Sequence, residues 1–263
     1  MTNYKMVLSY DGSRYRGWQV QGNTDMTIQG KLQTVLSRMT GEEIEVHGSG
    51  RTDAGVHAVG QVANFKAKAR LEVREIRDYL NEYLPEDIAV QSVEIASGQF
   101  HSRLNAYEKT YRYRIWTDTV PAVFERKYVT ELAEPLRIDD MKEAAEYLIG
   151  THDFISFCGN RRFKKSPVRT VSDIRFTKKE RELVIDVTGN GFLQNMVRIL
   201  VGTLVEVGLG RKRPEEMQHI LEGKNRDFAG PAMPAKGLCL MEVRYDARVP
   251  NGLPTGSYYP EEE

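Results

Sequence analysis

Apolar and polar residues recur with recognisable periods along residues 1–117. Residues 4–10 alternate and end at the Asp11–Gly12 turn signal, which predicts a strand. Residues 27–40 predict a helix, because their apolar residues fall on one face at helical spacing. That face consists of Ile28, Leu32, Val35, Leu36 and Met39. Residues 73–87 predict a second amphipathic helix that ends near Pro85. Further strands are expected at residues 43–47, 61–67, 87–97 and 107–117.

The rest of the chain has a comparable rhythm of elements. Residues 137–150 predict a helix that ends at Gly150, and residues 192–208 predict a long buried helix that contains Arg198. A further helix is expected from Pro214, because proline suits the first helical position. The inward face of the helix at 137–150 consists of Met141, Ala144, Ala145 and Leu148. Strands are expected at residues 171–179, 182–190 and 237–246.

This order of elements predicts an α+β protein built from two related α/β halves with mostly antiparallel sheets. We expect residues 1–105 to form the N-terminal half and residues 106–246 the C-terminal half. Residues 247–263 form a Pro/Gly-rich tail with little to pack. A central basic cleft between the two halves would be a natural ligand site.

Charge is balanced overall but unevenly distributed. The chain has 37 basic and 37 acidic residues, so it lacks the bulk signature of a nucleic-acid-binding protein. Basic clusters nevertheless occur at residues 161–169 and 210–214, and residues 101–114 interleave Arg and Lys with tyrosines. Each cluster is either a solvated face or a set of phosphate contacts, since phosphate neutralisation needs local positive charge.

The remaining composition indicates a cytoplasmic protein without a membrane span. The N-terminus lacks a basic region followed by a long apolar run, and no window approaches 18 uninterrupted apolar residues. Cys158 and Cys239 lie far apart and outside any zinc-ligand spacing, and we expect both to be reduced and buried. The five histidines show no metal-binding spacing, so no metal site is expected.

The stretch HGSGRTDAGVHAVGQ, residues 47–61, has four glycines around a charged pair. A dinucleotide fingerprint that starts at Gly48 would need its third glycine at position 53, where this chain has Asp53. Asp53 is therefore either an ordinary Asx-turn residue or an ionised nucleophile or base. Arg51 precedes it by two residues, and on a strand-like backbone both side chains would point the same way. The guanidinium would then keep Asp53 ionised.

Two further residues allow alternative interpretations. Arg198 lies within an apolar run, so it is either at a helix end in solvent or buried with a carboxylate or phosphate partner. A carboxylate partner would be a local one such as Glu206, or Asp53 across the cleft. Tyr111 either packs with Tyr113 in a sheet or provides a stacking platform for a base.

Several motifs resemble the tRNA pseudouridine synthase A family. SGRTDAGVHA is similar to the family's signature. The similarity continues in the family's order through YDGSRYRGWQVQ, KTYRYRIW, GTHDFISFC, GNGFLQNMVRILVG and AKGLCLMEVRY. Together the motifs cover roughly residues 4 to 245.

This resemblance implies an isomerase that converts uridine to pseudouridine at positions 38, 39 and 40 in the anticodon stem-loop of tRNA. It implies that Asp53 is the catalytic nucleophile and that Tyr111 packs against the target base. It also implies that Arg51 and Arg198 flank the aspartate and that Leu240 forms part of the pocket wall. The family's pattern further implies a cytoplasmic homodimer, tRNA as partner and no cofactor.

Basic residues near these motifs are candidates for contacts with the tRNA backbone. They are Arg161, Arg162, Lys164, Lys165, Lys109 and Arg112. Two rival functions remain open on local grounds. A non-catalytic RNA-binding protein would explain the basic and aromatic segments but not GRTDAG. An aspartyl-nucleophile enzyme acting on a phosphate would explain Asp53 but predicts an accompanying acidic metal site.

Overall fold

The structure, a computed structural model, describes residues 1–160 and 162–246 and divides into two compact units. Among the described residues, the first unit comprises residues 1–108 and 240–246, and the second comprises the described part of residues 109–239. Each unit combines helices with antiparallel strands, which confirms the predicted α+β class. Arg161 and the predicted tail at 247–263 lie outside the described residues.

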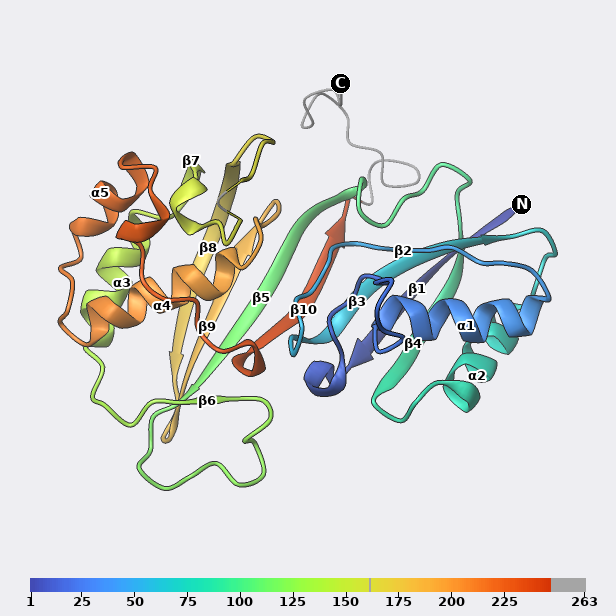
Figure 1. The fold of residues 1–263 in the computed structure, drawn as a ribbon, viewed down its shortest axis with the longest axis horizontal. Coiled ribbons are helices and arrows are strands. Elements are labelled where there is room, and N and C mark those ends of the chain that lie inside the picture. Colours follow the sequence, from blue (N-terminus) through green and yellow to red (C-terminus); the bar gives the residue numbers. More distant parts are fainter. Residues whose placement is uncertain (161, 247–263) are drawn as a thin grey trace. The chain divides into compact units, whose positions relative to one another are not determined.

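The first unit is an antiparallel sheet with two helices (Figure 1). Strand β1 pairs with β3 on one side and with β4 on the other, and the short β2 pairs with β3. Helix α2 packs against β4, and α1 packs against β2 and α2. The bounds are β1 Thr2–Tyr10, α1 Ile28–Thr40, β2 Val46–Gly48, β3 His57–Ala67, α2 Val73–Tyr83 and β4 Ile88–Ala96.

Helix α1 shows why the sequence pattern located the helices. The Thr27 side chain caps the helix by accepting from the Gly30 N–H, and Gly41 ends it with a left-handed φ of 70°. Four of the five residues predicted to face inward are buried: Ile28, Leu32, Val35 and Leu36. Met39 is only half-buried, so the buried face ends one turn earlier than predicted.

The second unit is a sheet of four antiparallel strands in the order β5-β9-β8-β7, with β6 parallel to β5. Helix α3 packs against α4, α5 and β8. The bounds are β5 Ala106–Trp116, β6 Thr130–Glu131, α3 Ile138–Glu146, β7 Gly150–Asp153, β8 Val168–Lys178, β9 Glu182–Gly189, α4 Met196–Gly208 and α5 Glu216–Glu222. Strand β10, Leu238–Tyr245, carries the chain back into the first unit.

Several predicted boundaries are wrong. Helix α4 begins at Met196 instead of residue 192, because Asn195 adopts a left-handed φ of 59° that interrupts helical backbone. Helix α5 begins at Glu216, since Pro214 lies in the preceding turn. Strand β3 begins at His57, four residues before the predicted start. Strand β2 covers only Val46–Gly48, and β7 was not predicted at all.

Two predictions made from composition can also be compared with the structure. Both cysteines are free, as expected, but only Cys158 is buried, whereas Cys239 is half-buried. The longest helices, α1 and α4, have 13 residues each. Within residues 1–160 and 162–246, no helix has the length and apolar character needed to cross a membrane.

Candidate active site

The loop at residues 49–56 joins β2 to β3 and carries both Arg51 and Asp53. A buried amide on β3, the strand that follows the loop, holds it: Gln61 Oε1 accepts from Ser49 Oγ at 2.6 Å. Gln61 Nε2 donates to the Gly50 carbonyl at 3.1 Å and to Tyr10 Oη at 3.3 Å. Tyr10 Oη in turn lies 2.8 Å from Thr52 Oγ1. These bonds fix the loop on both sides of Arg51.

Asp53 itself begins a tight turn. Its main-chain carbonyl accepts from the Val56 N–H at 3.1 Å, and Gly55 has a φ of 78°, as position three of a type II turn requires. The Trp18 N–H donates to the Thr52 carbonyl at 3.0 Å. Gly17 approaches this peptide so closely that a Cβ there would lie 2.6 Å from the same oxygen. The backbone of Asp53 is thereby fixed, while its side chain is half-buried.

Arg51 lies on the same loop but not on a strand. Strand β2 ends at Gly48 and β3 begins at His57, so the expectation that a strand-like backbone aligns Arg51 with Asp53 is wrong. The exposed Arg51 side chain donates from Nε to Gln19 Oε1 at 2.9 Å. Gln19, which lies 32 residues earlier in the chain, thereby orients the guanidinium of Arg51.

His57 follows the loop and has a structural role. It is buried, and its Nδ1 accepts from the Gly12 N–H at 3.0 Å. The Asp11 carboxylate lies 3.2 Å from the same nitrogen. His57 thus anchors the 3-10 turn η1, Gly12–Arg14, to β3.

Leu240 is the remaining predicted site residue of the first unit. It lies on β10 and is fully buried.

Tyr111 lies on β5 in the second unit. Only 8% of it is exposed, and its ring meets Phe192 edge-on with centroids 5.4 Å apart. Tyr113 shares its face of the strand. The Tyr113 hydroxyl is bonded to Thr130 Oγ1 at 2.6 Å and donates to the Pro234 carbonyl at 2.7 Å. Burial raises the pKa of Tyr113, so its hydroxyl stays protonated in the core.

Arg198 occupies the first turn of α4 and is half-buried. Its Nε donates to the Met233 carbonyl at 2.6 Å, and its own carbonyl accepts from the Met233 N–H at 3.1 Å. Glu206, the local carboxylate considered as its partner, forms an ion pair of 2.9 Å with Arg211. The paired contacts with Met233 orient Arg198 through the main chain.

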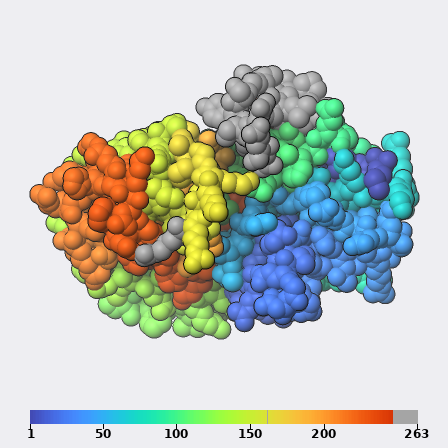
Figure 2. Space-filling model, turned by 45° about the horizontal axis from the view of Figure 1, so that its top comes forward, coloured from blue at the N-terminus to red at the C-terminus, as the bar shows by residue number. Residues whose placement is uncertain are grey.

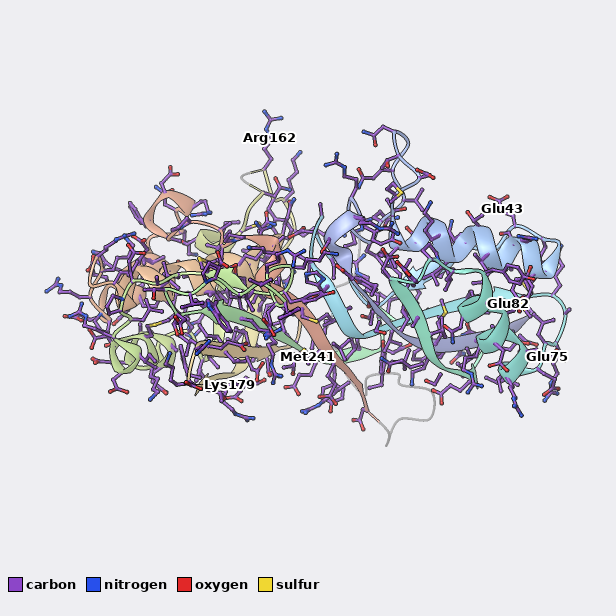
Figure 3. The ribbon with its side chains drawn as sticks, turned by 90° about the horizontal axis from the view of Figure 1, so that it is seen from below. Glu43, Glu75, Glu82, Arg162, Lys179 and Met241 are labelled. Carbon is purple, nitrogen blue, oxygen red and sulfur yellow. The ribbon has the colours of Figure 1, made fainter. Side chains whose placement is uncertain are left out.

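The candidate RNA-binding residues differ in how they are held. Arg112 forms a bidentate pair with Asp186, with N–O distances of 2.7 and 2.9 Å, and this hydrogen bonding raises its pKa. Lys109 is half-buried on the same strand. Arg162, Lys164 and Lys165 are exposed, and Figure 3 shows Arg162 extending away from the body of its unit. These three residues belong to the part of the chain coloured yellow in Figure 2, which lies at the molecular surface. Arg161 lies outside the described residues.

Acidic and sulfur-bearing side chains do not gather into a metal site in the part of the chain that the structure describes. Within it, no group of three or more His, Cys, Asp or Glu residues could hold a metal ion.

Comparison with known proteins decides the family. The family model described as tRNA pseudouridine synthase matches residues 6–103 and 144–246. The chain belongs to the tRNA pseudouridine synthase family. The match confirms the resemblance inferred from the motifs. It covers Arg51, Asp53, Arg198 and Leu240, whereas Tyr111 lies between the two matched segments.

Curated relatives of this tRNA pseudouridine synthase family match nearly the whole chain. A tRNA pseudouridine synthase A of Bacillus sp. (strain KSM-64) is 49% identical over 245 residues, which is 93% of this chain and 100% of that protein. One of Clostridium tetani (strain Massachusetts / E88) is also 49% identical with the same coverage. Among solved structures, a Cbf5–Nop10–Gar1 complex covers 90% of this chain and 48% of its own. Its TM-score of 0.37 and 14% identity are too low to support an argument.

The chain is accordingly an isomerase of the tRNA pseudouridine synthase family. Sequence reasoning located the family's GRTDAG loop but missed the residues that hold it: Gln61, Tyr10, Ser49 and Thr52. The available signal was Gln61 itself, the polar first residue of the strand predicted at residues 61–67.

Proposed function

We propose that this pseudouridine synthase modifies positions 38, 39 and 40 in the anticodon arm of tRNA and that Asp53 is its nucleophile. The family match across the loop at 49–56 carries the proposal. The geometry supports it, because a half-buried carboxylate on a fixed backbone is placed reproducibly while remaining accessible.

The reaction needs no net change in composition. The N1–C1′ bond of uridine breaks, the uracil turns, and a C5–C1′ bond forms. C5 then loses its hydrogen as a proton, and N1 gains one, so atoms and electrons balance. An aspartate can stabilise this exchange by forming and later releasing a covalent bond to the nucleoside.

The other site residues receive roles from their chemistry. Tyr111 packs its ring against the target uracil, which has to leave the base stack, and Leu240 contributes to the pocket wall. Arg51 and Arg198 flank Asp53 and bind the substrate through their guanidinium groups. The two tethers to Gln19 and Met233 support these roles, because an oriented guanidinium loses less side-chain entropy when it acts.

We further propose that the enzyme acts as a cytoplasmic homodimer without a cofactor. Arg162, Lys164, Lys165 and Lys109 contact the tRNA backbone, together with Arg161. Arg112 is bound to Asp186 and contacts the RNA as a member of that pair.

The test is to incubate the purified chain with an unmodified tRNA transcript and no added cofactor, and then to map pseudouridines by carbodiimide labelling. We expect labelling at positions 38, 39 and 40 where they are uridines. Asp53→Asn should lower the rate by about a thousandfold or more while tRNA binding persists.

The matched control is Asp25→Asn, because Asp25 is an exposed carboxylate of the same unit that pairs with Lys31. This variant should retain the wild-type rate. A wild-type chain that binds tRNA but converts no uridine of the anticodon arm to pseudouridine would contradict the proposal. An active Asp53→Asn variant would remove Asp53 as the nucleophile.

A further inference from the structure

A second group of ionisable side chains lies in the first unit, outside the loop at 49–56. The segment at residues 97–105, between β4 and β5, is bonded to β2 and β3. Ser102 donates from its N–H to Asn64 Oδ1 at 2.8 Å and from Oγ to the His47 carbonyl at 2.6 Å. These bonds place the ring of His101 4.9 Å from that of His47, centroid to centroid.

Positive charge dominates this place. Lys66 on β3 and Arg103 on the segment itself are both exposed and act on His101. The pKa of His101 is lowered, first by burial and then by the charges of His47, Arg103 and Lys66. A carboxylate also faces this place: Glu45, which directly precedes β2, lies 3.7 Å from His47 Nδ1 and is 75% exposed, so solvent screens it.

The proton on His101 has a defined position. Its Nδ1 accepts from the Arg103 N–H at 3.1 Å, so the neutral ring carries its proton on Nε2. That nitrogen is available to donate to an oxygen. Two large apolar side chains follow, Leu104 in the same segment and Tyr107 on β5, and each is about half exposed.

We propose that His47, Lys66, His101 and Arg103, here called the histidine cluster, bind a backbone phosphate of tRNA. This inference rests on the proposed function, because tRNA is the polyanion that the enzyme must hold. A phosphate offers several acceptor oxygens within a small volume, which matches a group of neighbouring basic donors better than a single carboxylate does. His47 also lies only six residues before Asp53, so the contact would hold the RNA on the unit that carries the nucleophile.

The cluster makes tRNA binding dependent on pH. A phosphate stabilises the charged form of the His101 imidazole, so the lowered pKa of this group rises in the complex and binding takes up a proton. Affinity therefore increases as the pH falls from 8 to 6. The other charged groups at this place are Glu45, Lys66 and Arg103.

Two double variants test the proposal in the full chain, with Asp53→Asn added so that bound tRNA is not converted. Lys66→Gln with Arg103→Gln alters only exposed residues and should preserve folding. It should weaken binding about tenfold and reduce the slope of log K against log salt by about 1. His47→Gln with His101→Gln should remove the tightening between pH 8 and pH 6. His219→Gln, an exposed histidine on α5, is the matched control and should retain that tightening.

A direct measurement separates this inference from the proposed function. NMR titration of the histidine ring protons with inorganic phosphate should show the His101 pKa rising, whether or not any uridine is converted. If both double variants bind tRNA with wild-type affinity at pH 6 and at pH 8, the inference is overturned. A loss of affinity for an acidic peptide such as polyglutamate in the same variants would not rescue it. In that case uridine conversion by the wild-type chain would leave the proposed function standing.

Discussion

The amide of Gln61 bonds two residues of the Asp53 loop and Tyr10 of β1 at the same time. It is fully buried, and it bonds Ser49, the Gly50 carbonyl and Tyr10. A buried polar group whose partners are all within the protein is costly to remove, because each partner then loses its bond without gaining water. The position of Asp53 thus depends on a side chain that is not a candidate for the chemistry.

Gln61→Leu keeps most of the volume of this side chain and removes its amide. We expect the free energy of unfolding to fall by about 2 to 4 kcal/mol, since the hydroxyl of Ser49 and the carbonyl of Gly50 lose their partner. The rate of uridine conversion should fall more than the affinity for tRNA does. Urea unfolding measures the free energy of unfolding, and single-turnover kinetics over a range of enzyme concentrations measure the rate and the affinity for tRNA.

The control for Gln61 is Gln91→Leu, because Gln91 is exposed and its amide donates to a single carbonyl, that of Val59. Its unfolding free energy should change by less than about 0.5 kcal/mol. Equal losses in the two variants would show that the buried network adds nothing beyond a surface amide.

Tyr15, in the segment before α1, is bonded to Asp87, which directly precedes β4. Its hydroxyl donates to Asp87 Oδ1 at 2.5 Å, and Arg14 donates to Oδ2 of the same carboxylate at 2.7 Å. Burial raises the pKa of Tyr15 to about 12, and the bond to Asp87 adds to this effect. A raised pKa means that the folded state holds the proton more tightly than the unfolded state. This stabilisation is complete below about pH 10 and is lost as the pH rises towards 12.

Tyr15→Phe tests that dependence. At pH 8 the variant should lose about 1.5 to 3 kcal/mol of unfolding free energy, as expected for a hydrogen bond to a charged group. At pH 11 the difference from wild type should be smaller, because wild type has lost part of the same stabilisation. Urea unfolding at both pH values measures this difference. Tyr107→Phe, at an exposed position, serves as the control, and a deficit of Tyr15→Phe that is constant with pH would contradict the argument.

At this scale the sequence allowed Asp53 to be singled out but not explained. Local physics left it between a turn residue and a nucleophile, and only the chain-wide resemblance favoured the second. The bonds of Gln61 and Tyr15 join residues 11 to 72 positions apart, and no sequence period reports such pairs. The bond from Arg198 to Met233 was unforeseeable for the same reason.

Among the elements, sequence periods located helices well and their ends poorly. Apolar spacing gave α1 and α3 with their buried faces, because burial is what creates the spacing. It extended α4 by four residues at its start, since Phe192 and Leu193 continue the apolar run without helical backbone. The interruption comes from the φ of Asn195, a property of one residue that the period cannot register.

Gly202 in α4 gives a prediction at the scale of packed elements. A Cβ at this position would lie 1.8 Å from the Pro231 carbonyl oxygen, so the segment around Pro231 can cross the helix only where a side chain is absent. Alanine favours helix by about 1 kcal/mol over glycine, yet Gly202→Ala should destabilise the protein by about 2 kcal/mol or more. Thermal unfolding measures the loss. Gly22→Ala, where a Cβ meets nothing within 4 Å, should change little, and a stabilised Gly202→Ala would refute the close approach.

For the molecule as a whole, equal numbers of basic and acidic residues conceal two kinds of cation. Some are neutralised locally: Lys31 pairs with Asp25, and Arg74 and Arg77 both pair with Asp78. The other kind includes the exposed Arg162 and Lys164, which lie in a stretch of the sequence, residues 161–169, that contains no acidic residue. Composition alone could not distinguish them, because the distinction depends on which carboxylates the fold brings near.

The salt dependence of tRNA binding tests this distinction. Arg162, Lys164 and Lys165 changed together to Gln should reduce the slope of log K against log salt by about 2 to 3, since each phosphate contact releases counterions. The matched control changes Lys31, Arg74 and Arg77 to Gln, which removes the same charge from the helices α1 and α2. These cations already have carboxylate partners, so the control should leave the slope nearly unchanged. Equal slopes for the two triple variants would mean that the protein's charge acts on tRNA only as a total, without a defined basic contact segment.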